Sequence, residues 1–512
     1  MAATAALALA AALLAFAGFC RGSPQGGLPS RDFPPGFMFG AATAAFQIEG
    51  AWNLSGKGEN IWDRWTHQHP DWVADGSNAD VACDSFHRFK ADVQALVDTG
   101  FDFYRFSISW SRILPRGTVD YVNEEGLWYY NRLLTELMAH RITPVVTMFH
   151  WDLPQPLQDL GGWPNPVIAD YFEDYARILF RHFGDRVKYW ITINEPASII
   201  ESYANSRLGA PGLDEHGVAD YQASHTLLKA HAKAYHLYDK YFRKTQKGRV
   251  SITLNSAWLE PRTNSQEDRQ AAERARQFYF GYWAHPIYSK IGDYPAVMKE
   301  RIMRNSLAEG RFRSRLPEFS PQWVKFIRGT ADFFAYNHYT TRYAASGTEG
   351  EIPSLQRDSG VIRSFDPKWP SSASSWLKVV PWGLRKMLNW IKKEYGNLPV
   401  LITENGFSDH GGLHDKARIN YFVSYLQELL KAIYIDKCNV FGYTAWSLVD
   451  NFEWARGYTE KFGIYQVNFT DPNRARIPKD SAQALRKIIK HRALVPNLLQ
   501  GEMPEPRVVL VT

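Results

Sequence analysis

The sequence has few cysteines and, beyond its N-terminal segment, no long apolar run. Three cysteines in 512 residues, with no Cys-x-x-Cys pair and no Cys/His zinc spacing, argue against a disulfide-stapled domain and against a zinc site. We expect Cys83 and Cys438 to be buried free thiols, with one disulfide between them as the alternative. Because no later stretch reaches about 18 apolar residues, we expect no membrane span in the remainder of the chain.

Residues 1–20 carry no charged side chain and include the apolar run 5–19. This run is short for a membrane span of about 20 residues and typical of a signal-peptide core, although the usual Lys or Arg is missing. We therefore predict a signal peptide over 1–20, which includes Cys20, and a secreted protein without membrane contact after cleavage; an N-terminal anchor is the alternative. The sequons at Asn53 (Asn-Leu-Ser) and Asn468 (Asn-Phe-Thr) are predicted N-glycosylation sites.

The chain also lacks a strong charge of either sign. Its 59 Lys and Arg residues nearly balance its 53 Asp and Glu residues, and no basic stripe is present, so no nucleic-acid partner is expected. No glycine-rich dinucleotide or phosphate loop follows any expected strand. By contrast, aromatic residues make up 14% of the chain. A large core explains this content, and so does a carbohydrate site, because the flat apolar faces of sugars pack on aromatic rings.

Short apolar runs alternate with helical patterns along most of the chain. The runs cover 37–43, 103–109, 144–150, 190–195, 250–255, 333–338, 400–404 and 440–446. Continuously apolar strands that alternate with helices indicate a parallel sheet, and eight such units favour a closed barrel over an open sheet. We predict an α/β fold, a single (β/α)8 TIM barrel with inserted loops, with a catalytic domain over 31–493 and a C-terminal tail over 494–512.

Three stretches lack a clear strand or helix pattern. We expect 57–81 and 344–375 to be irregular loops inserted into the barrel. The basic run from Arg311 to Arg315 is expected to form a solvated surface turn.

Polar residues end several of the predicted strands. In this kind of barrel the active site lies at the carboxyl ends of the strands. Glu195 ends the fourth run and Glu404 the seventh, so both are expected to point into the mouth of the barrel. Because an unpaired buried charge is costly, each needs a reason to be there. A strand-end salt bridge explains either alone, whereas two carboxylates across an aromatic pocket are what glycoside hydrolysis requires.

Four segments then carry a family resemblance. They are FMFGAATAAFQIEG at 37–50, TINEP at 192–196, ITENG at 402–406 and WSLVDNFEW at 446–454. Occurring in this order and at expected strand ends, they resemble the signatures of glycoside hydrolase family 1, the β-glucosidase-type enzymes, over about residues 33–493. The resemblance is greatest to secreted animal members, insect ones among them.

The resemblance implies roles for the matching residues. Glu195 matches the general acid/base of the family and Glu404 its nucleophile. Residues that match groups around the substrate are Gln47, His150, Asn194, Asn337, Tyr339, Trp376, Trp446, Glu453 and Trp454. Of these, Trp446 matches the stacking floor under the sugar and Trp376 an aromatic platform for the leaving group. Arg105, Asn255 and Tyr339 match residues that support the nucleophile. The resemblance implies no cofactor and no metal.

The implied activity is that of a retaining exo-β-glycosidase acting on small-molecule or oligosaccharide β-glycosides. Its glycone is expected to be a terminal non-reducing β-D-glucosyl residue, with galactosyl or fucosyl residues as alternatives. A thioglucosidase stays open, although plant members of that kind have Gln where this chain has Glu195. Phospho-β-glycosidases carry Ser in place of Glu453, and non-catalytic relatives lose one of the two catalytic glutamates, so both are disfavoured.

Overall fold

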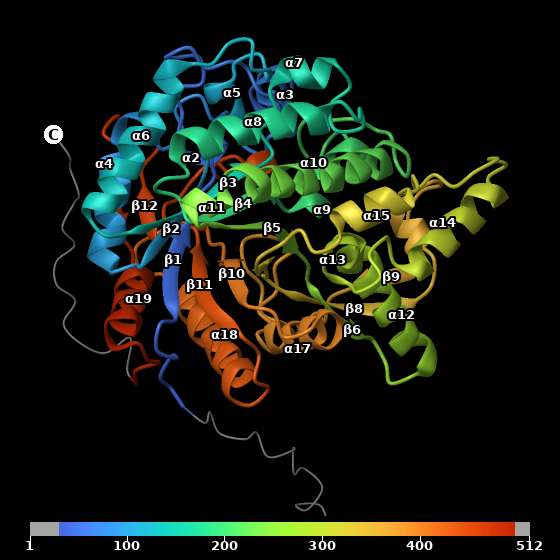
Figure 1. Ribbon diagram of the computed structural model, residues 1–512. Coiled ribbons are helices and arrows are strands. Elements are labelled where there is room, and N and C mark those ends of the chain that lie inside the picture. The colour runs from blue at the N-terminus through green and yellow to red at the C-terminus, as the bar shows by residue number, and fades with distance from the viewer. Residues whose placement is uncertain (1–29, 497–512) are drawn as a thin grey trace, which may run out of the picture.

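The computed structural model describes residues 30–496, and its centre is a closed barrel of eight parallel strands (Figure 1). In their order around the barrel the strands are β1 (Met38–Ala42), β11 (Val440–Trp446), β10 (Val400–Asn405), β7 (Phe334–Asn337), β5 (Arg249–Asn255), β4 (Tyr189–Asn194), β3 (Thr143–Phe149) and β2 (Phe103–Ser107). Each predicted apolar run overlaps one of these strands, and the predicted barrel is confirmed. The predicted signal peptide lies outside the described residues, as does the tail from 497 onward.

Helices surround the barrel on its outer side (Figure 1). The longer ones are α4 (Ser85–Thr99), α6 (Glu124–Ala139), α8 (Ile168–Phe183), α10 (Ala219–Tyr241), α12 (Gln266–Arg276), α14 (Ala296–Ala308), α17 (Trp382–Tyr395), α18 (Lys416–Tyr434) and α19 (Asp480–His491). The shorter ones are α2 (Ala45–Ile48), α3 (Ile61–Gln68), η1 (Pro70–Trp72), α5 (Trp110–Ile113), α7 (Gln155–Asp159), α9 (Pro196–Ala204), α11 (Arg243–Gln246), η2 (Gln277–Gly281), α13 (Tyr282–Tyr288), α15 (Pro321–Ile327), α16 (Leu355–Ser359) and η3 (Trp454–Arg456).

The spacing of apolar residues decides which side of each helix is buried. In α18, Ile419, Phe422, Leu426 and Leu429 recur at helical spacing, and all four are buried. Full burial of a side chain of this size stabilises the fold by roughly 1.5–3 kcal/mol. The barrel helices are therefore held mainly by their apolar stripes. Inside the barrel, five strands contribute a separate apolar cluster that includes Phe103 and Leu401.

The two stretches expected to be irregular contain regular structure, so this prediction is wrong. Within 57–81, α3 begins at a capping box in which the Asn60 side chain accepts from the backbone N–H of Asp63 and the Asp63 carboxylate accepts from the N–H of Asn60. Within 344–375, β8 (Thr341–Ser346) and β9 (Val361–Ser364) pair antiparallel. With β6 (Trp258–Pro261) they form a three-stranded sheet beside the barrel. A further small sheet pairs β12 (Tyr465–Val467) with β13 (Arg476–Pro478).

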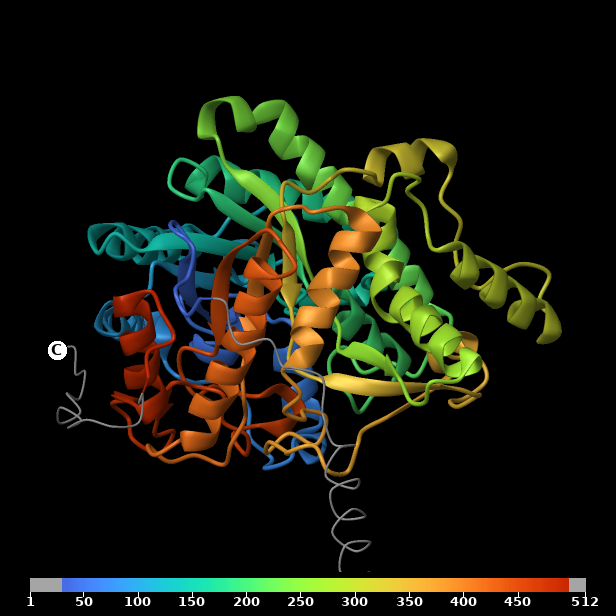
Figure 2. The ribbon, with the colours of Figure 1, turned by 90° about the horizontal axis from the view of Figure 1, so that it is seen from below.

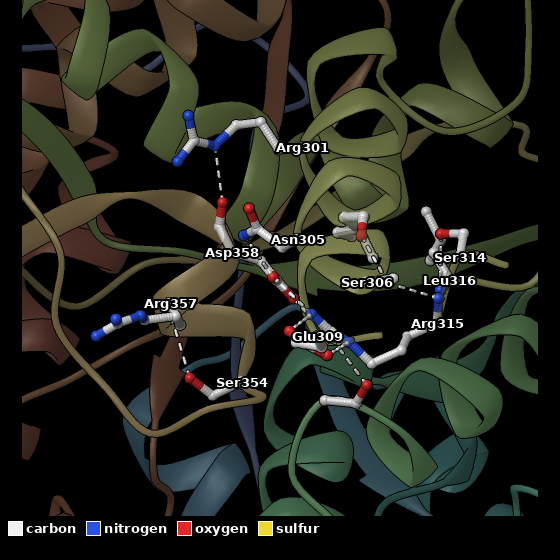
Figure 3. Close-up of polar contacts among 12 residues, drawn as sticks. Arg301, Asn305, Ser306, Glu309, Ser314, Arg315, Leu316, Ser354, Arg357 and Asp358 are labelled. Carbon is white, nitrogen blue, oxygen red and sulfur yellow. Dashed lines mark hydrogen bonds and ion pairs between the residues drawn. The ribbon is translucent and has the colours of Figure 1, made fainter. Parts of the chain in front are cut away.

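Helix α14 projects from the side of the molecule, as both views show (Figures 1 and 2). The basic run follows this helix. Arg311 and Arg313 are exposed there, as expected of a surface turn. Arg315 is buried, and its guanidinium pairs with Asp358 at 2.8 Å and with Glu309 at 2.9 Å (Figure 3). The prediction is therefore wrong for Arg315, whose main partner lies 43 residues away in the sequence.

The two ends of the described chain lie together. Asp32 and Ala493 form a β-bridge, and the N–H of Leu494 donates to the carbonyl of Arg31. Leu494 is buried in the core, so the packed structure continues past the expected start of the tail. Cys83 and Cys438 are both free and buried, as predicted. Over residues 30–496, no helix is long and apolar enough to cross a membrane.

Candidate active site

A cavity of about 690 Å³ opens at the carboxyl ends of the barrel strands. Most of the predicted site residues line it, namely His150, Asn194, Glu195, Asn255, Asn337, Tyr339, Trp376, Glu404, Trp446, Glu453 and Trp454. Arg105 and Gln47 are completely buried behind this wall, and each is hydrogen-bonded to residues of it. Strand ends that are far apart in the sequence thus meet at one site.

Glu404 lies near the end of β10 and is held by two donors. Arg105 on β2 donates from Nη1 to Glu404 Oε1 at 2.6 Å, and the Tyr339 hydroxyl donates to Oε2 at 2.7 Å. Burial and the charge of Glu404 raise the pKa of Tyr339, so its phenol keeps the proton that it donates. A buried guanidinium and a phenol on one carboxylate stabilise negative charge there. The predicted contacts of Arg105 and Tyr339 with Glu404 are present.

Both glutamate-bearing strands are irregular where they reach the cavity. The pairing of β10 with β7 shifts register between Ile402 and Glu404, and that of β4 with β5 shifts between Ile191 and Asn194. Glu195 follows with a left-handed φ of 48°, immediately before Pro196 opens α9. Bulges near active sites re-aim side chains, and a left-handed non-glycine residue is strained. The backbone is therefore bent at the positions from which the two carboxylates enter the cavity.

Glu195 is only 7% exposed and has neutral hydrogen-bond donors. Asn337 Nδ2 donates to Oε1 at 2.6 Å and Ser198 Oγ to Oε2 at 2.9 Å. Burial, and next the negative charge of Glu404, raise the pKa of Glu195 to about 8. Glu195 is therefore mostly protonated at neutral pH.

Asn194 connects the buried arginine to the cavity wall. Its Oδ1 accepts from Arg105 Nη2 at 2.6 Å, so its amide nitrogen faces His150, whose Nε2 is 3.0 Å away. Arginine can only donate, so its bond to Oδ1 fixes the orientation of the Asn194 amide. The amide nitrogen therefore donates to His150, and His150 Nε2 is the acceptor. Burial and the charge of Arg105 lower the pKa of His150 well below its usual value. His150 is hence a neutral imidazole with its proton on Nδ1, an atom that has no partner among the described residues.

A second set of polar contacts lies around Glu453. Gln47 Nε2 donates to the carbonyl of Phe452 at 2.9 Å and to Glu453 Oε2 at 3.3 Å, while Gln47 Oε1 is buried without a partner in the described chain. Burial, followed by the charges of Glu460 and Glu404, raises the pKa of Glu453. This end of the cavity therefore presents acceptor oxygens that a set of sugar hydroxyls can satisfy.

Aromatic rings close the cavity around these polar groups. The His150 ring lies nearly parallel to Trp446 and to Trp454, with centroids 5.9 Å and 6.0 Å away. Trp376 packs edge-on against Tyr339 with centroids 5.5 Å apart and is 37% exposed, so it lies at the mouth. The deep end is thus enclosed by indoles and the mouth carries one partly exposed indole.

Asn255 lines the cavity at the end of β5, but its side chain is hydrogen-bonded on the Glu195 side. Its Nδ2 donates to Ser198 Oγ at 3.0 Å, and Ser198 in turn contacts Glu195. The expectation that Asn255 supports the nucleophile is corrected, because the side chain belongs to the hydrogen-bond chain of Glu195. Asn337, expected to contact substrate, is likewise bonded directly to Glu195.

The sequence analysis missed several residues of the site. Ser198 lies one helical turn after Glu195, and this spacing in α9 was a usable signal. Trp151, whose Nε1 donates to the Asn194 carbonyl at 2.9 Å, follows His150 directly. Glu460, Arg342 and Arg363 also line the cavity, but they come from inserted segments whose position no local pattern reveals. Within residues 30–496, no group of three or more His, Cys, Asp or Glu side chains is arranged to hold a metal ion.

Comparison with known proteins shows the family of the chain. The family model for glycosyl hydrolase family 1 matches residues 29–494. The chain belongs to glycosyl hydrolase family 1. It is 48% identical over 459 residues to myrosinase 1 of Brevicoryne brassicae, which covers 89% of this chain and 98% of the relative. It is 46% identical over 471 residues to the human cytosolic beta-glucosidase, covering 91% of this chain and all of the relative.

A solved structure has the same fold as this chain. A rice beta-glucosidase carrying a Glu-to-Gln substitution, in a covalent complex with glucose, is 40% identical and superposes with a TM-score of 0.83 over 91% of this chain and 99% of that one. The family resemblance that the four sequence segments indicated is confirmed, as is the glycoside hydrolase class.

Proposed function

We propose that this family 1 chain is a retaining exo-β-glycosidase that hydrolyses terminal non-reducing β-D-glucosyl residues, and galactosyl or fucosyl residues as further glycones. The observation that carries the proposal is the contrast between the two carboxylates in the cavity. Glu404 accepts from a guanidinium, whereas the pKa of Glu195 is raised to about 8. One carboxylate suited to attack and one carboxylic acid suited to proton donation are the parts that glycoside hydrolysis needs.

In the first step, a Glu404 oxygen attacks the anomeric carbon and the bond from that carbon to the leaving oxygen breaks. Glu195 gives its proton to the leaving oxygen and becomes a carboxylate. Arg105 and Tyr339 donate to Glu404, and their hydrogen bonds orient it for attack. The product of this step is a glycosyl ester on Glu404 with inverted anomeric configuration.

In the second step, the Glu195 carboxylate removes a proton from a water molecule. That water attacks the anomeric carbon and displaces Glu404, which restores the β configuration and returns the proton to Glu195. Ser198 and Asn337 donate to Glu195 and stabilise its charged form between the two steps. Two inversions at one carbon give net retention.

Glu453 and its neighbours are proposed to recognise the glycone. The Glu453 carboxylate, the free Oε1 of Gln47 and the Nδ1–H of His150 provide acceptors and a donor for sugar hydroxyls. Hydrogen bonds from sugar hydroxyls favour the charged form of Glu453, which accepts from two hydroxyls at once and repels a 6-phosphate. Trp446 and Trp454 supply the apolar surface for the sugar ring.

Secretion and glycosylation remain part of the proposal. Asn53 and Asn468 are both exposed, and the Asn468 side-chain oxygen accepts from the Thr470 hydroxyl at 2.8 Å. Exposed sequons fit a glycoprotein that enters the secretory pathway behind a 1–20 signal peptide. Expression in animal cells should give a secreted product whose mass falls on glycosidase treatment, and less so in an Asn468→Gln variant.

A 2-deoxy-2-fluoroglucosyl fluoride tests the proposed activity directly. The fluorine at C2 slows both steps, whereas the anomeric fluoride is a good leaving group that keeps the first step fast. The glycosyl ester should therefore accumulate and appear by mass spectrometry on the peptide that contains Glu404. The Glu404→Gln variant serves as the control and should stay unlabelled. An adduct on the Glu195 peptide, or none at all on an active enzyme, would contradict the proposal. A parallel screen of aryl O- and S-glucosides, galactosides, fucosides and 6-phosphoglucosides resolves the glycone and the thioglucosidase alternative.

A further inference from the structure

The two ends of the segment that carries Glu453 meet at the side chain of Asp450. Asp450 lies three residues before Glu453, and its Oδ1 accepts from the backbone N–H of Gly463 at 3.0 Å. The backbone N–H of Asp450 donates to the carbonyl of Tyr465 at 2.9 Å. Between these points the chain lines the cavity with Glu453, Trp454, Ala455, Arg456, Glu460 and Phe462. Asp450 therefore joins the start of the segment 450–463 to its end.

Lys479 contacts this carboxylate from outside the segment. It follows β13, and its Nζ lies 2.8 Å from Asp450 Oδ1, the oxygen that also accepts from Gly463. Both side chains of the pair are buried, and no other lysine in residues 30–496 is completely buried. The backbone N–H of Lys479 donates to the carbonyl of Ile464 at 2.9 Å. Main chain and side chain thus both anchor Lys479 beside the segment 450–463.

Among the described residues, Asp450 is the only carboxylate that pairs with Lys479. The charges that act on Lys479 include those of Asp450, Arg418 and Asp409. Arg418 already pairs with Asp409 at 2.7 Å and with Asp415. Burial lowers the pKa of Lys479, and the negative charge of Asp450 opposes this shift. The buried ammonium and the buried Asp450 carboxylate therefore neutralise each other.

Stability alone does not explain a buried ion pair of this kind. Taking an ammonium and a carboxylate out of water is costly, and apolar side chains of similar volume are often as stable or more stable in their place. Removing one ion only is strongly destabilising, so both must stay in contact. The pair between Lys479 and Asp450 therefore restricts the geometry of the backbone that carries it.

Gln47 holds the same part of the segment from the cavity side. Its Nε2 donates to Asn451 Oδ1 at 3.2 Å, to the carbonyl of Phe452 at 2.9 Å and to Glu453 Oε2 at 3.3 Å. The N–H of Phe452 donates to the Gln47 carbonyl at 3.1 Å. Residues 450–453 thus lie between two anchors, Gln47 at one end and Lys479 at the other.

We propose that Lys479 is a positioning residue for the glycone, whose ion pair with Asp450 sets the place of the Glu453 carboxylate that receives the sugar hydroxyls. The inference rests on the proposed role of Glu453 and extends it to a residue that does not line the cavity. Without the ammonium, the segment 450–463 loses its outer anchor and Glu453 meets the hydroxyls less well. The two carboxylates of the proposed chemistry, on other strands, keep their own hydrogen-bond donors.

A matched pair of substrates tests the inference. The 4-nitrophenyl β-D-glucoside has a 6-hydroxyl, and its 6-deoxy analogue lacks only this group. The readout is the ratio of kcat/KM for the glucoside to kcat/KM for the 6-deoxyglucoside, because partial unfolding lowers both values equally and leaves the ratio unchanged. Lys479→Met should lower the ratio by at least about threefold, since a charge-assisted hydrogen bond to the 6-hydroxyl is weakened. Glu453→Ser should lower it further.

Arg315→Met is the control. Arg315 and Asp358 form an ion pair of the same length, 2.8 Å, and of the same burial, and neither residue lines the cavity (Figure 3). This variant should keep the wild-type ratio. The double variant Asp450→Asn/Lys479→Met leaves no unpaired buried charge, so it should fold even where the single variant does not. It should also show the lowered ratio.

The outcomes separate the inference from the function on which it rests. A wild-type ratio in folded Lys479→Met or in the double variant, or an equal fall in Arg315→Met, would overturn the positioning role and leave the glycosidase proposal intact. If Glu453→Ser also keeps the wild-type ratio, the proposed role of Glu453 is wrong. If the wild type hydrolyses neither substrate nor any other aryl glycoside, the proposed function itself is wrong.

Discussion

Glu404 and Glu195 are the same residue type in one cavity, yet their surroundings are opposite. Glu404 accepts from a cationic guanidinium and from a phenol. Within residues 30–496, Glu195 accepts only from the neutral Asn337 amide and the Ser198 hydroxyl, and the charge of Glu404 acts on it. Sequence position alone does not separate their roles, because both end a barrel strand. In the proposed mechanism, the donors supplied by the neighbouring strands suit Glu404 to act as the nucleophile and Glu195 as the acid.

The largest expected effect is the loss of the carboxylate that carries the covalent step. Glu404→Ala should lower kcat/KM by roughly 10⁴-fold or more on every glycoside, however good the leaving group. Added azide should restore turnover and give an α-glycosyl product, which product NMR identifies. A β-glycosyl azide from this variant would reverse the two roles.

The loss of activity in Glu195→Ala should depend on the leaving group, which distinguishes the role of Glu195 from that of Glu404. Loss of general acid catalysis costs roughly 10²–10⁴-fold on glycosides whose leaving group needs a proton. A dinitrophenyl glucoside needs little protonation, so its first step should be nearly spared in stopped-flow measurements. Identical behaviour of the Glu195→Ala and Glu404→Ala variants with this substrate would contradict the proposed difference between the roles of Glu195 and Glu404.

Glu453→Ser should act on binding of the sugar and not on the chemistry of either carboxylate. Losing the contacts with two hydroxyls should lower kcat/KM on glucosides at least about tenfold. In the wild type, plain glucosides should react far faster than 6-phosphoglucosides, and some galactoside activity should appear. An unchanged glucoside value, or a wild-type preference for the phosphorylated sugar, argues against this placement of Glu453.

Ser198→Ala should give the smallest effect, a shift in pH dependence. In the proposed mechanism Glu195 is the proton donor, so kcat/KM should fall as the pH rises through its pKa of about 8. Ser198 donates to Glu195 and lowers that pKa; removing it should move the basic limb upward by roughly half to one pH unit. Ser424→Ala on α18, away from the cavity, is the control. A downward shift would mean that Ser198 does not stabilise the Glu195 carboxylate.

Elements with their own periodicity could be predicted from the sequence. All eight barrel strands were found, because each is a continuous apolar run between helical patterns. The two glutamates were found because strand ends converge in such a barrel. Their hydrogen bonds with Arg105, Tyr339 and Asn337 join segments that are 65 to 299 residues apart.

The structure of the inserted segments could not be predicted from the sequence. Strands β8 and β9 are short and pair with each other outside the barrel, so no barrel periodicity marks them. Arg315 belongs to a basic run that looks solvated, and only the fold brings Asp358 to it. Arg342 and Arg363 lie on the same inserted sheet.

A titration of Glu195 itself tests the central claim, that opposite surroundings give the two carboxylates their roles. Difference infrared spectroscopy or carboxyl-labelled NMR should be run on the wild type and on Glu404→Gln. The account predicts a pKa near 8 for Glu195 in the wild type. In the variant it should be lower because the negative charge is gone, yet still above the usual range because burial is the larger cause. An ordinary pKa in the wild type, or no change on removing the Glu404 charge, would contradict the account.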